Sequence, residues 1–337
     1  GINVEAHHKI IKEKAGDIDF LKQLIPSFPF ERPTLAEAKN SFNELCLFSD
    51  YSLNKKKWFA KGNLEGDILI NQNKIGLKAS NYFHWHTRMT CDSLTSPSAI
   101  RNWYDRKLRI SLEKSIYYKD SPSSWKTALS LRKYIPSQFR PTAAKLLLNY
   151  FKATRWYDPC GGWGDRLLAA QSYKNLFMPE VEYFCREVNP LLFIGYAEQV
   201  RHFGGKAHFE YKGSEEDCPV SEYFDLVFTS PPYYKVEKYQ GEKQSHKKYK
   251  KFEDWVECFL LPMLTYSWKS LKKGGVMAIN IANVYANHTH NDCCSPVIDF
   301  LKKKTTVNLI GYQMGKRPNS FSDREGIYCE PIIYGKK

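Results

Sequence analysis

Apolar and polar residues follow two different patterns on either side of residue 135. After it, short apolar runs alternate with longer stretches in which apolar residues recur every three to four positions. This alternation is typical of strands followed by helices, which build a parallel sheet. Before it, apolar residues stand in short irregular clusters broken by charges, as in NKKKWFAKGN. The pattern predicts two domains, residues 1–134 and residues 135–337.

The second domain carries enough periodicity to predict its elements one by one. In chain order they are a helix over 141–152 that begins at Pro141, a strand over 154–158, a glycine turn over 160–164 with a helix through 174, a strand over 181–187, a helix from about Asn189, a strand over 207–211, a strand ending at Thr229, a helix over 252–271 that ends at Gly274-Gly275, a strand over 276–282, a helix over 296–303, and strands over 306–314 and 328–335. These elements predict a doubly wound α/β sheet with its sites at the carboxyl ends of the strands.

Composition fits an intracellular globular protein. The 337 residues are 42% hydrophobic, and no run approaches the roughly 18 apolar residues of a membrane span. The first residues, GINVEAHHKI, lack the apolar stretch of a signal peptide. The nine cysteines include no CxxC pair, which favours free thiols in a reducing compartment. We expect a cytoplasmic or nuclear protein without membrane contact.

The charge points to a polyanionic partner. Lysine and arginine outnumber aspartate and glutamate by 50 to 36, and the net charge is +14. Nucleic acid is the usual physical reason for such an excess, and a merely basic protein is the alternative. Positive charge does not separate DNA from RNA. The sequence also leaves open a homodimer or a partner subunit.

A glycine turn follows the first strand of the second domain. The stretch WYDPCGGWGDRLLAA places Asp158 at the strand end, then Gly162 and Gly164, then a helix. Glycines let the backbone approach a ligand and adopt positive φ. The spacing is not the GxGxxG dinucleotide fingerprint, and no Gly-Lys-Ser/Thr of a phosphate loop follows. Alone, such a turn is as often structural as functional.

Acidic residues at the next strand ends strengthen the case for a ligand. Glu187 closes the second strand, where a carboxylate can accept both hydroxyls of a ribose. Glu216 or Asp217 follows the third strand and could accept from an adenine amino group. Each acid alone is more often a helix cap or a solvated turn. Together with Asp158 they predict a pocket for an adenosine without a phosphate tail, which S-adenosylmethionine fits.

Two motifs carry a resemblance to a known family. Asp158-Pro159-x-x-Gly162-x-Gly164, followed by Ser230-Pro231-Pro232-Tyr233, resembles the DNA amino-methyltransferases of the N4-cytosine/N6-adenine type, which use S-adenosylmethionine. The resemblance spans about residues 135–335 and implies a Rossmann-like doubly wound methyltransferase sheet with an N-terminal accessory domain. It implies cofactor contacts from Arg140, Pro141, Thr142, Asp158, Pro159, Gly162, Gly164, Glu187, Val188, Glu216, Asp217 and Ser230.

The tetrapeptide Ser230 to Tyr233 has a chemical rationale in this family. An exocyclic amine is a poor nucleophile because its lone pair is delocalised into the ring. A carbonyl held rigid by Pro231 and Pro232 can accept one amine hydrogen, and the Ser230 hydroxyl can accept the other. Tyr233 would stack on the base, which must leave the duplex to reach the pocket. Serine at the first position slightly favours N4 of cytosine over N6 of adenine.

Two neighbouring features receive different interpretations. Cys160 resembles a Pro-Cys nucleophile, but it lies inside the cofactor loop, and we expect a small buried thiol instead. The polar, basic and aromatic stretch after the tetrapeptide could contact nucleic acid or form a solvated loop. Its candidate contacts are Tyr234, Glu237, Tyr239, Lys247, Lys248 and Lys250.

Residues 1–134 match no known module. Their basic and aromatic clusters, Lys55 to Phe59 and Arg101, Trp103, Arg106 and Arg109, suit target recognition on DNA, with a scaffold as the alternative. His84 and His86 would share one face of a strand, and more candidate ligands follow in HTHNDCC. Neither has the spacing of a zinc site, and no metal is expected.

The sequence therefore predicts a DNA methyltransferase that modifies the exocyclic amine of a flipped base. An RNA amino-methyltransferase is the first alternative. A non-catalytic nucleic-acid-binding subunit on a methyltransferase fold is the second, and the intact motifs disfavour it. The sequence does not disclose the recognition site or whether the protein belongs to a restriction-modification pair.

Overall fold

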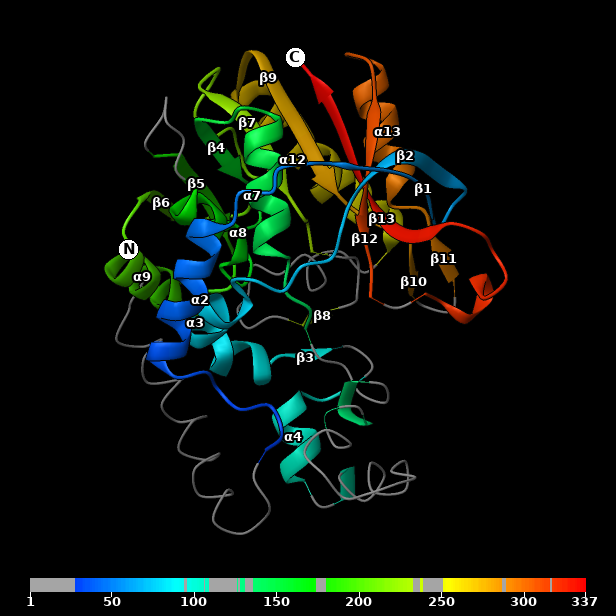
Figure 1. Ribbon diagram of the computed structural model, residues 1–337. Coiled ribbons are helices and arrows are strands. Elements are labelled where there is room, and N and C mark those ends of the chain that lie inside the picture. The colour runs from blue at the N-terminus through cyan, green and yellow to red at the C-terminus, as the bar shows by residue number, and fades with distance from the viewer. Residues whose placement is uncertain are drawn as a thin grey trace.

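The computed structural model describes most of the chain (Figure 1). The described residues are 28–93, 96–105, 107–108, 126, 128–130, 136–173, 180–232, 237–238, 251–286, 289–315 and 317–337.

A single nine-stranded sheet organises the described residues. Its order is β1-β2-β12-β13-β9-β7-β4-β5-β6. The strands are β1 (Asn54–Ala60), β2 (Leu64–Ile70), β4 (Arg155–Asp158), β5 (Glu182–Glu187), β6 (Lys206–Tyr211), β7 (Phe224–Thr229), β9 (Leu271–Asn280), β12 (Asn308–Gln313) and β13 (Ile327–Lys336). Short pairs β3 (Asp92–Ser93) with β8 (Glu237–Lys238), and β10 (Val284–Ala286) with β11 (Thr289–Asn291), lie outside it.

The central strands are wound in both directions from β4. β4 pairs in parallel with β5 on one side and with β7 on the other, β5 with β6, and β7 with β9. β13 then runs antiparallel to both β9 and β12. Because the strand order reverses at β4, a crevice opens at the carboxyl ends of β4 and β7. The predicted doubly wound α/β fold is confirmed.

Helices cover both faces of the sheet. One layer contains α2 (Leu35–Leu47), α3 (Leu77–Met89), α7 (Pro141–Tyr150), α8 (Asp165–Ser172) and α9 (Leu192–Phe203). The other contains α11 (Phe252–Trp255), α12 (Leu261–Ser270) and α13 (Cys294–Lys302). Each face of the sheet has its own hydrophobic core. Neighbouring residues of β4 point to opposite faces, so Trp156 packs in one core and Tyr157 in the other. Alternation along a strand requires this division.

The end of the predicted helix over 252–271 is corrected. Helix α12 ends at Ser270 and β9 begins at once at Leu271, so Gly274 and Gly275 lie within the strand. The register against β7 shifts there, and Gly274 has a φ of +85°. The glycine pair therefore forms a bulge rather than a helix cap. Before α12, residues Val256–Leu260 form a π-helical turn, because Pro262 cannot donate to a regular helical ladder.

The sheet crosses the predicted boundary at residue 134. β1 and β2 extend it beyond β12, since β2 pairs with β12 and β1 with the start of β13. Trp58 fills the space between these strands, and Gly66 and Gly311 leave room for its indole. Helices α2 and α3 pack on α8 and α9. The first third of the chain is therefore partly continuous with the nine-stranded sheet.

The rest of the N-terminal part forms its own small core. Phe28, Trp85, Trp103 and Tyr104 pack together around α4 (Ala99–Tyr104), below the sheet in Figure 1. Trp58 and Phe59 are also buried, so these aromatics are core residues rather than a stacking surface. Lys55, Lys56 and Lys57 on β1 and Arg101 on α4 are exposed, whereas Arg106 and Arg109 lie outside the described residues.

Two further predictions from the sequence can be compared with the structure. All nine cysteines are free thiols, as predicted. Among the helices of the described ranges, none combines the length and apolar character needed to cross a bilayer.

Candidate active site

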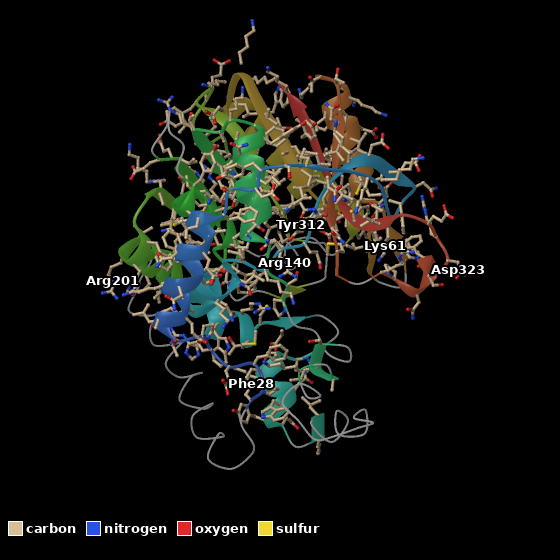
Figure 2. The ribbon with its side chains drawn as sticks, viewed as in Figure 1. Phe28, Lys61, Arg140, Arg201, Tyr312 and Asp323 are labelled. Carbon is tan, nitrogen blue, oxygen red and sulfur yellow. The ribbon has the colours of Figure 1, made fainter. Side chains whose placement is uncertain are left out.

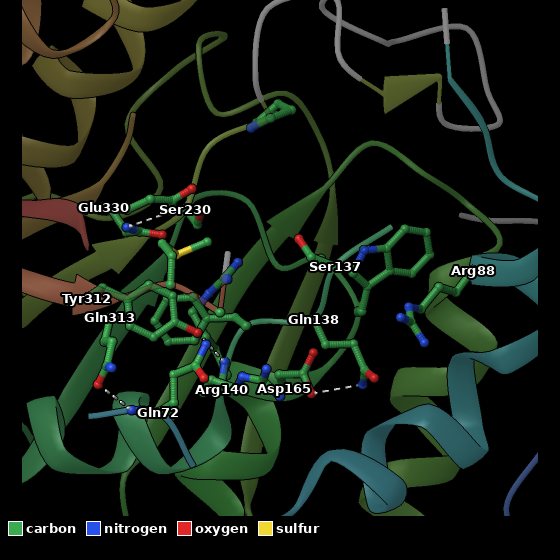
Figure 3. Close-up of a pocket in the computed structure, with 18 of the residues that line it drawn as sticks. Gln72, Arg88, Ser137, Gln138, Arg140, Asp165, Ser230, Tyr312, Gln313 and Glu330 are labelled. Atoms are coloured by element: carbon green, nitrogen blue, oxygen red, sulfur yellow. Dashed lines mark hydrogen bonds between the residues drawn. The ribbon is translucent and has the colours of Figure 1, made fainter. Parts of the chain in front are cut away.

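A cavity of about 570 Å³ opens at the carboxyl ends of β4, β7 and β9 (Figure 3). It is lined by Phe30, Gln72, Arg88, Ser130, residues 137–140, residues 161–163, Asp165, Arg166, residues 230–232, Asn280, residues 312–315 and Glu330. Segments that are far apart in the sequence, including three residues before position 90, therefore meet in one place.

The glycine turn has the backbone that its sequence predicted. Gly162 and Gly164 have φ values of +67° and +79°, a region that side chains rarely adopt. A Cβ on Gly164 would also overlap the side chains of Gln199 and His84. Glycine is therefore required at position 164 for both conformation and space.

Asp158 anchors this turn from inside the protein. Its carboxylate is fully buried and accepts hydrogen bonds from Tyr183 Oη (2.6 Å), Thr229 Oγ1 (2.6 Å) and the Cys160 N–H (3.3 Å). It also pairs with Arg166 Nε at 2.8 Å. It does not line the cavity. Protein donors surround the carboxylate, so Asp158 acts as an internal anchor of the turn, and its predicted contact with a cofactor stays a prediction.

Arg166 connects the anchor to the loop itself. Besides pairing with Asp158, its guanidinium donates to the carbonyls of Cys160 and Gly161. Those carbonyls belong to the turn, so the ion pair fixes its path before any ligand arrives. Such preorganisation reduces the entropy that binding must overcome.

Glu187 ends β5 beside the turn, as predicted. Its carboxylate accepts from the backbone N–H groups of Gly162 (3.0 Å), Val188 (2.7 Å) and Asn189 (2.8 Å). Burial raises the pKa of Glu187, and these hydrogen bonds oppose that shift. A carboxylate has about four acceptor positions, so about one remains for a ligand hydroxyl.

The acids of the third loop are engaged with the protein. Glu216 accepts from the Gly213 N–H at 2.5 Å. Asp217 pairs with Lys212 and, at 2.6 Å, with Arg186. The hydrogen bond from Lys212 is the main cause of the lowered pKa of Asp217. Both side chains thus hold the loop after β6, and neither lines the cavity.

The predicted site residues divide into three groups. The cavity brings together Arg140, Gly162, Ser230, Pro231 and Pro232. Its lining excludes Pro141, Thr142, Asp158, Pro159, Gly164, Glu187, Val188, Glu216 and Asp217. Tyr233, Tyr234, Tyr239, Lys247, Lys248, Lys250 and the side chain of Glu237 lie outside the described residues.

Arg140 is positioned by the start of α7. Its backbone N–H donates to Tyr312 Oη at 2.9 Å, and the two residues lie together in the centre of Figure 2. Pro141 occupies the first helical position, as its missing N–H allows. Burial raises the pKa of Tyr312 above its usual value, so its hydroxyl stays neutral.

Several residues of this cavity were not predicted from the sequence. Asp165, the first residue of α8, is 2% exposed and lines it. Its Oδ1 accepts from Ser80 Oγ and from Gln138 Nε2 (3.2 Å), as Figure 3 shows for Gln138. Its Oδ2 has no hydrogen-bond partner among the described residues. Burial raises the pKa of Asp165 to about 7. Its place directly after Gly164 was the available signal.

A second missed group lies beside Ser230. Asn280 ends β9 and Glu330 comes from β13, and Asn280 Nδ2 donates to Glu330 Oε2 at 3.4 Å. Figure 3 shows Ser230 and Glu330 near one another on the side of the cavity away from Asp165 and Arg88. No local motif marks either residue, because they arrive through strand pairing.

The alternative chemistries considered for the sequence find little support in the geometry. Burial raises the pKa of the Cys160 thiol, whose sulfur contacts Ser214 Oγ at 3.9 Å. His84 lies on helix α3 rather than on a strand, and its Nε2 meets Gln199 Oε1 at 2.5 Å. Within the residues that the structure describes, no cluster of acidic, His and Cys side chains could hold a metal ion.

Comparison with known proteins gives a likeness at the level of fold. No family model and no curated protein matches the chain. Solved structures similar to it include a precorrin-6y C5,15-methyltransferase from Geobacter metallireducens (15% identity, TM-score 0.40, 61% of this chain and 93% of that one) and an rRNA methylase from Streptococcus thermophilus (13%, 0.36, 60% and 99%). A third is an S-adenosylmethionine-dependent O-methyltransferase from Thermotoga maritima (13%, 0.35, 62% and 70%).

The strand order, rather than these low scores, carries the fold assignment. The β6-β5-β4-β7-β9 order with the antiparallel β13 beside β9 makes the sheet Rossmann-like and doubly wound. This agrees with the Rossmann-like, doubly wound sheet expected from the sequence.

Proposed function

We propose that this protein is an S-adenosylmethionine-dependent methyltransferase that acts on the exocyclic amine of a base in DNA. The observation that carries the proposal is the meeting of Gly162, Arg140 and the Ser230-Pro231-Pro232 segment around one cavity. The glycine turn, which would bind the cofactor, and the Ser230-Pro231-Pro232 segment, which would bind the amine, thus line the same cavity. N4 of cytosine is slightly favoured over N6 of adenine by the serine at position 230.

The residues around the glycine turn fit the cofactor. The Gly162 backbone can approach it closely, and Glu187 retains about one acceptor position for a ribose hydroxyl. The buried Oδ2 of Asp165 needs a donor that the described residues do not supply. When bound, S-adenosylmethionine supplies an electrophilic methyl group on a sulfonium.

The segment after β7 would activate the amine by position. Pro231 is buried and lines the cavity, and two successive prolines restrict the chain at this point. The Ser230 hydroxyl can accept one amine hydrogen and a backbone carbonyl of the segment another. Both acceptors favour a pyramidal nitrogen whose lone pair is directed at the methyl group. No covalent bond between protein and base is required.

The test supplies tritiated S-adenosylmethionine with mixed-sequence DNA and, separately, with total RNA. Products are digested to nucleosides and identified by mass. N4-methylcytosine or N6-methyladenine from DNA is the expected result. Ser230→Ala should lose most of the label, while Ser322→Ala, an exposed serine away from the cavity, should retain it.

The same assay separates the alternatives. Label confined to RNA would replace the DNA proposal with an RNA amino-methyltransferase. Label on a carbon or a ring nitrogen would overturn the role of Ser230. A protein that binds neither S-adenosylmethionine nor its product would be the non-catalytic nucleic-acid-binding subunit.

A further inference from the structure

Asp165 carries one carboxylate oxygen for which the described part of the protein offers no partner. The side chain is 2% exposed, lines the cavity, and is fixed at Oδ1 by Ser80 and Gln138. Oδ2 is buried and without a hydrogen bond. An unsatisfied buried acceptor costs about 1–3 kcal/mol, and more when it is charged. Such a cost is retained where a ligand supplies the missing donor.

The surroundings of Asp165 contain both signs of charge. Arg88 and Arg140 line the same cavity, and Arg88 is held by the Pro136 carbonyl (2.6 Å) and Asn81 Oδ1 (3.2 Å). Arg88 and Arg166 also lower the cost of ionising Asp165. A carboxylate flanked by guanidinium groups suits a zwitterion rather than a simple cation.

The position of Asp165 within the cavity indicates which zwitterionic ligand group it would bind. Asp165 follows the glycine turn directly, whereas Ser230 and Glu330 lie on the other side (Figure 3). The end near the turn is the cofactor end under the proposed function. S-adenosylmethionine carries an ammonium and a carboxylate on its amino-acid tail.

We propose that Asp165 Oδ2 accepts a hydrogen bond from the protonated α-amino group of the cofactor's amino-acid tail. The inference rests on the proposed function and adds a binding residue to it. Ser80, on α3, orients the carboxylate through Oδ1, and Arg88 on the same helix supplies positive charge near the tail carboxylate. The N-terminal third of the chain thereby helps to form the cofactor site.

The first experiment compares two ligands by calorimetry. S-adenosylhomocysteine carries the amino-acid tail, and 5′-methylthioadenosine lacks it. Asp165→Asn should bind S-adenosylhomocysteine about 10- to 100-fold more weakly, the expected loss of a charged hydrogen bond. Its affinity for 5′-methylthioadenosine should stay within about twofold. Glu198→Gln, at a half-exposed carboxylate paired with Arg201 on α9, is the matched control and should change neither affinity.

A second measurement needs no variant. The groups that face Asp165 are Ser80 and Arg88 from α3, Gln138, Arg166 from α8 and Tyr312 from β12. The pKa of Asp165 is about 7, so near pH 6.5 the folded protein carries a partly protonated carboxyl. An ammonium selects the ionised form, so S-adenosylhomocysteine should release up to one proton on binding. Calorimetry in buffers of different ionisation enthalpy measures this, and 5′-methylthioadenosine should release fewer protons.

The outcomes distinguish the two proposals. If the wild-type protein binds neither ligand, the proposed function fails and this inference fails with it. If it binds S-adenosylhomocysteine and Asp165→Asn binds it equally well, the inference alone is overturned. If Asp165→Asn does not fold, proton release by the wild-type protein decides, and proton uptake or no transfer overturns the inference.

Discussion

Two buried aspartates flank the glycine turn, and their environments are opposite. Asp158 at the end of β4 is paired with Arg166 and accepts from Tyr183, Thr229 and a backbone N–H. Asp165 at the start of α8 has Ser80 and Gln138 on one oxygen and no partner on the other. From this difference we infer a structural role for Asp158 and propose a ligand-binding role for Asp165, whereas the sequence predicted the ligand contact at Asp158.

The largest expected effect separates the two acids by stability. Asp158→Asn leaves the Arg166 guanidinium buried without its counter-charge, which should cost about 3–5 kcal/mol in the free energy of unfolding. Asp165→Asn keeps an acceptor for Ser80 and Gln138 and removes a buried acid that is partly ionised at pH 7, so at this pH it should leave the free energy of unfolding unchanged or raise it. Urea titration followed by circular dichroism measures both. Equal losses of stability in the two variants would contradict the different roles inferred for the two aspartates.

The second effect is the pH dependence that Asp165 imposes. The carboxyl has a pKa of about 7 in the folded protein and near 3.8 when unfolded, so between these values the folded state binds more protons. Stability should therefore fall as pH rises from about 4 to about 7, by on the order of 3–4 kcal/mol from this group. Above about pH 8, where the carboxyl is ionised in both states, its contribution should be constant. The difference between wild type and Asp165→Asn, measured by urea titration across this range, isolates it, and parallel curves would contradict the assignment.

The third effect tests the turn between the two acids. Gly164→Ala meets both a φ of +79° and overlap with Gln199 and His84, and should cost about 2–4 kcal/mol. Gly274→Ala is the matched control, because Gly274 has a φ of +85° but open space around it. It should cost only about 1–2 kcal/mol. Thermal unfolding of both variants would show whether the overlap adds to the backbone strain.

The smallest expected effect concerns turnover at the far side of the cavity. Ser230→Ala removes one acceptor for the amine and should lower kcat about 10-fold, with the affinity for S-adenosylhomocysteine unchanged. Steady-state kinetics and calorimetry on the same preparation measure the two quantities. A parallel loss of affinity would place Ser230 on the cofactor instead of the amine.

The sheet was predictable because its central strands are buried on both faces. Leu226 to Phe228 and Val276 to Ile279 read as short apolar runs between turn signals, and each became a strand. The rule that sites gather at carboxyl strand ends then brought Ser230 and Gly162 together correctly.

The features that could not be predicted depend on tertiary contacts that no local sequence pattern indicates. Ser80 meets Asp165 across 85 positions of the chain, and the FHWHTR stretch that follows Ser80 gave no sign of a helix that would bring the two together. Gly274 illustrates a different limit, since a helix cap and a strand bulge both use a glycine with positive φ. Asp158 and Asp165 differ only in their tertiary partners.

The most decisive measurement is a crystal structure of the protein with S-adenosylhomocysteine. We expect the adenosine beside Glu187, the sulfur facing Ser230, and the tail amine within hydrogen-bond distance, about 2.7–3.2 Å, of Asp165 Oδ2. A ligand whose tail points away from Asp165, or that binds outside the cavity, would contradict this expectation.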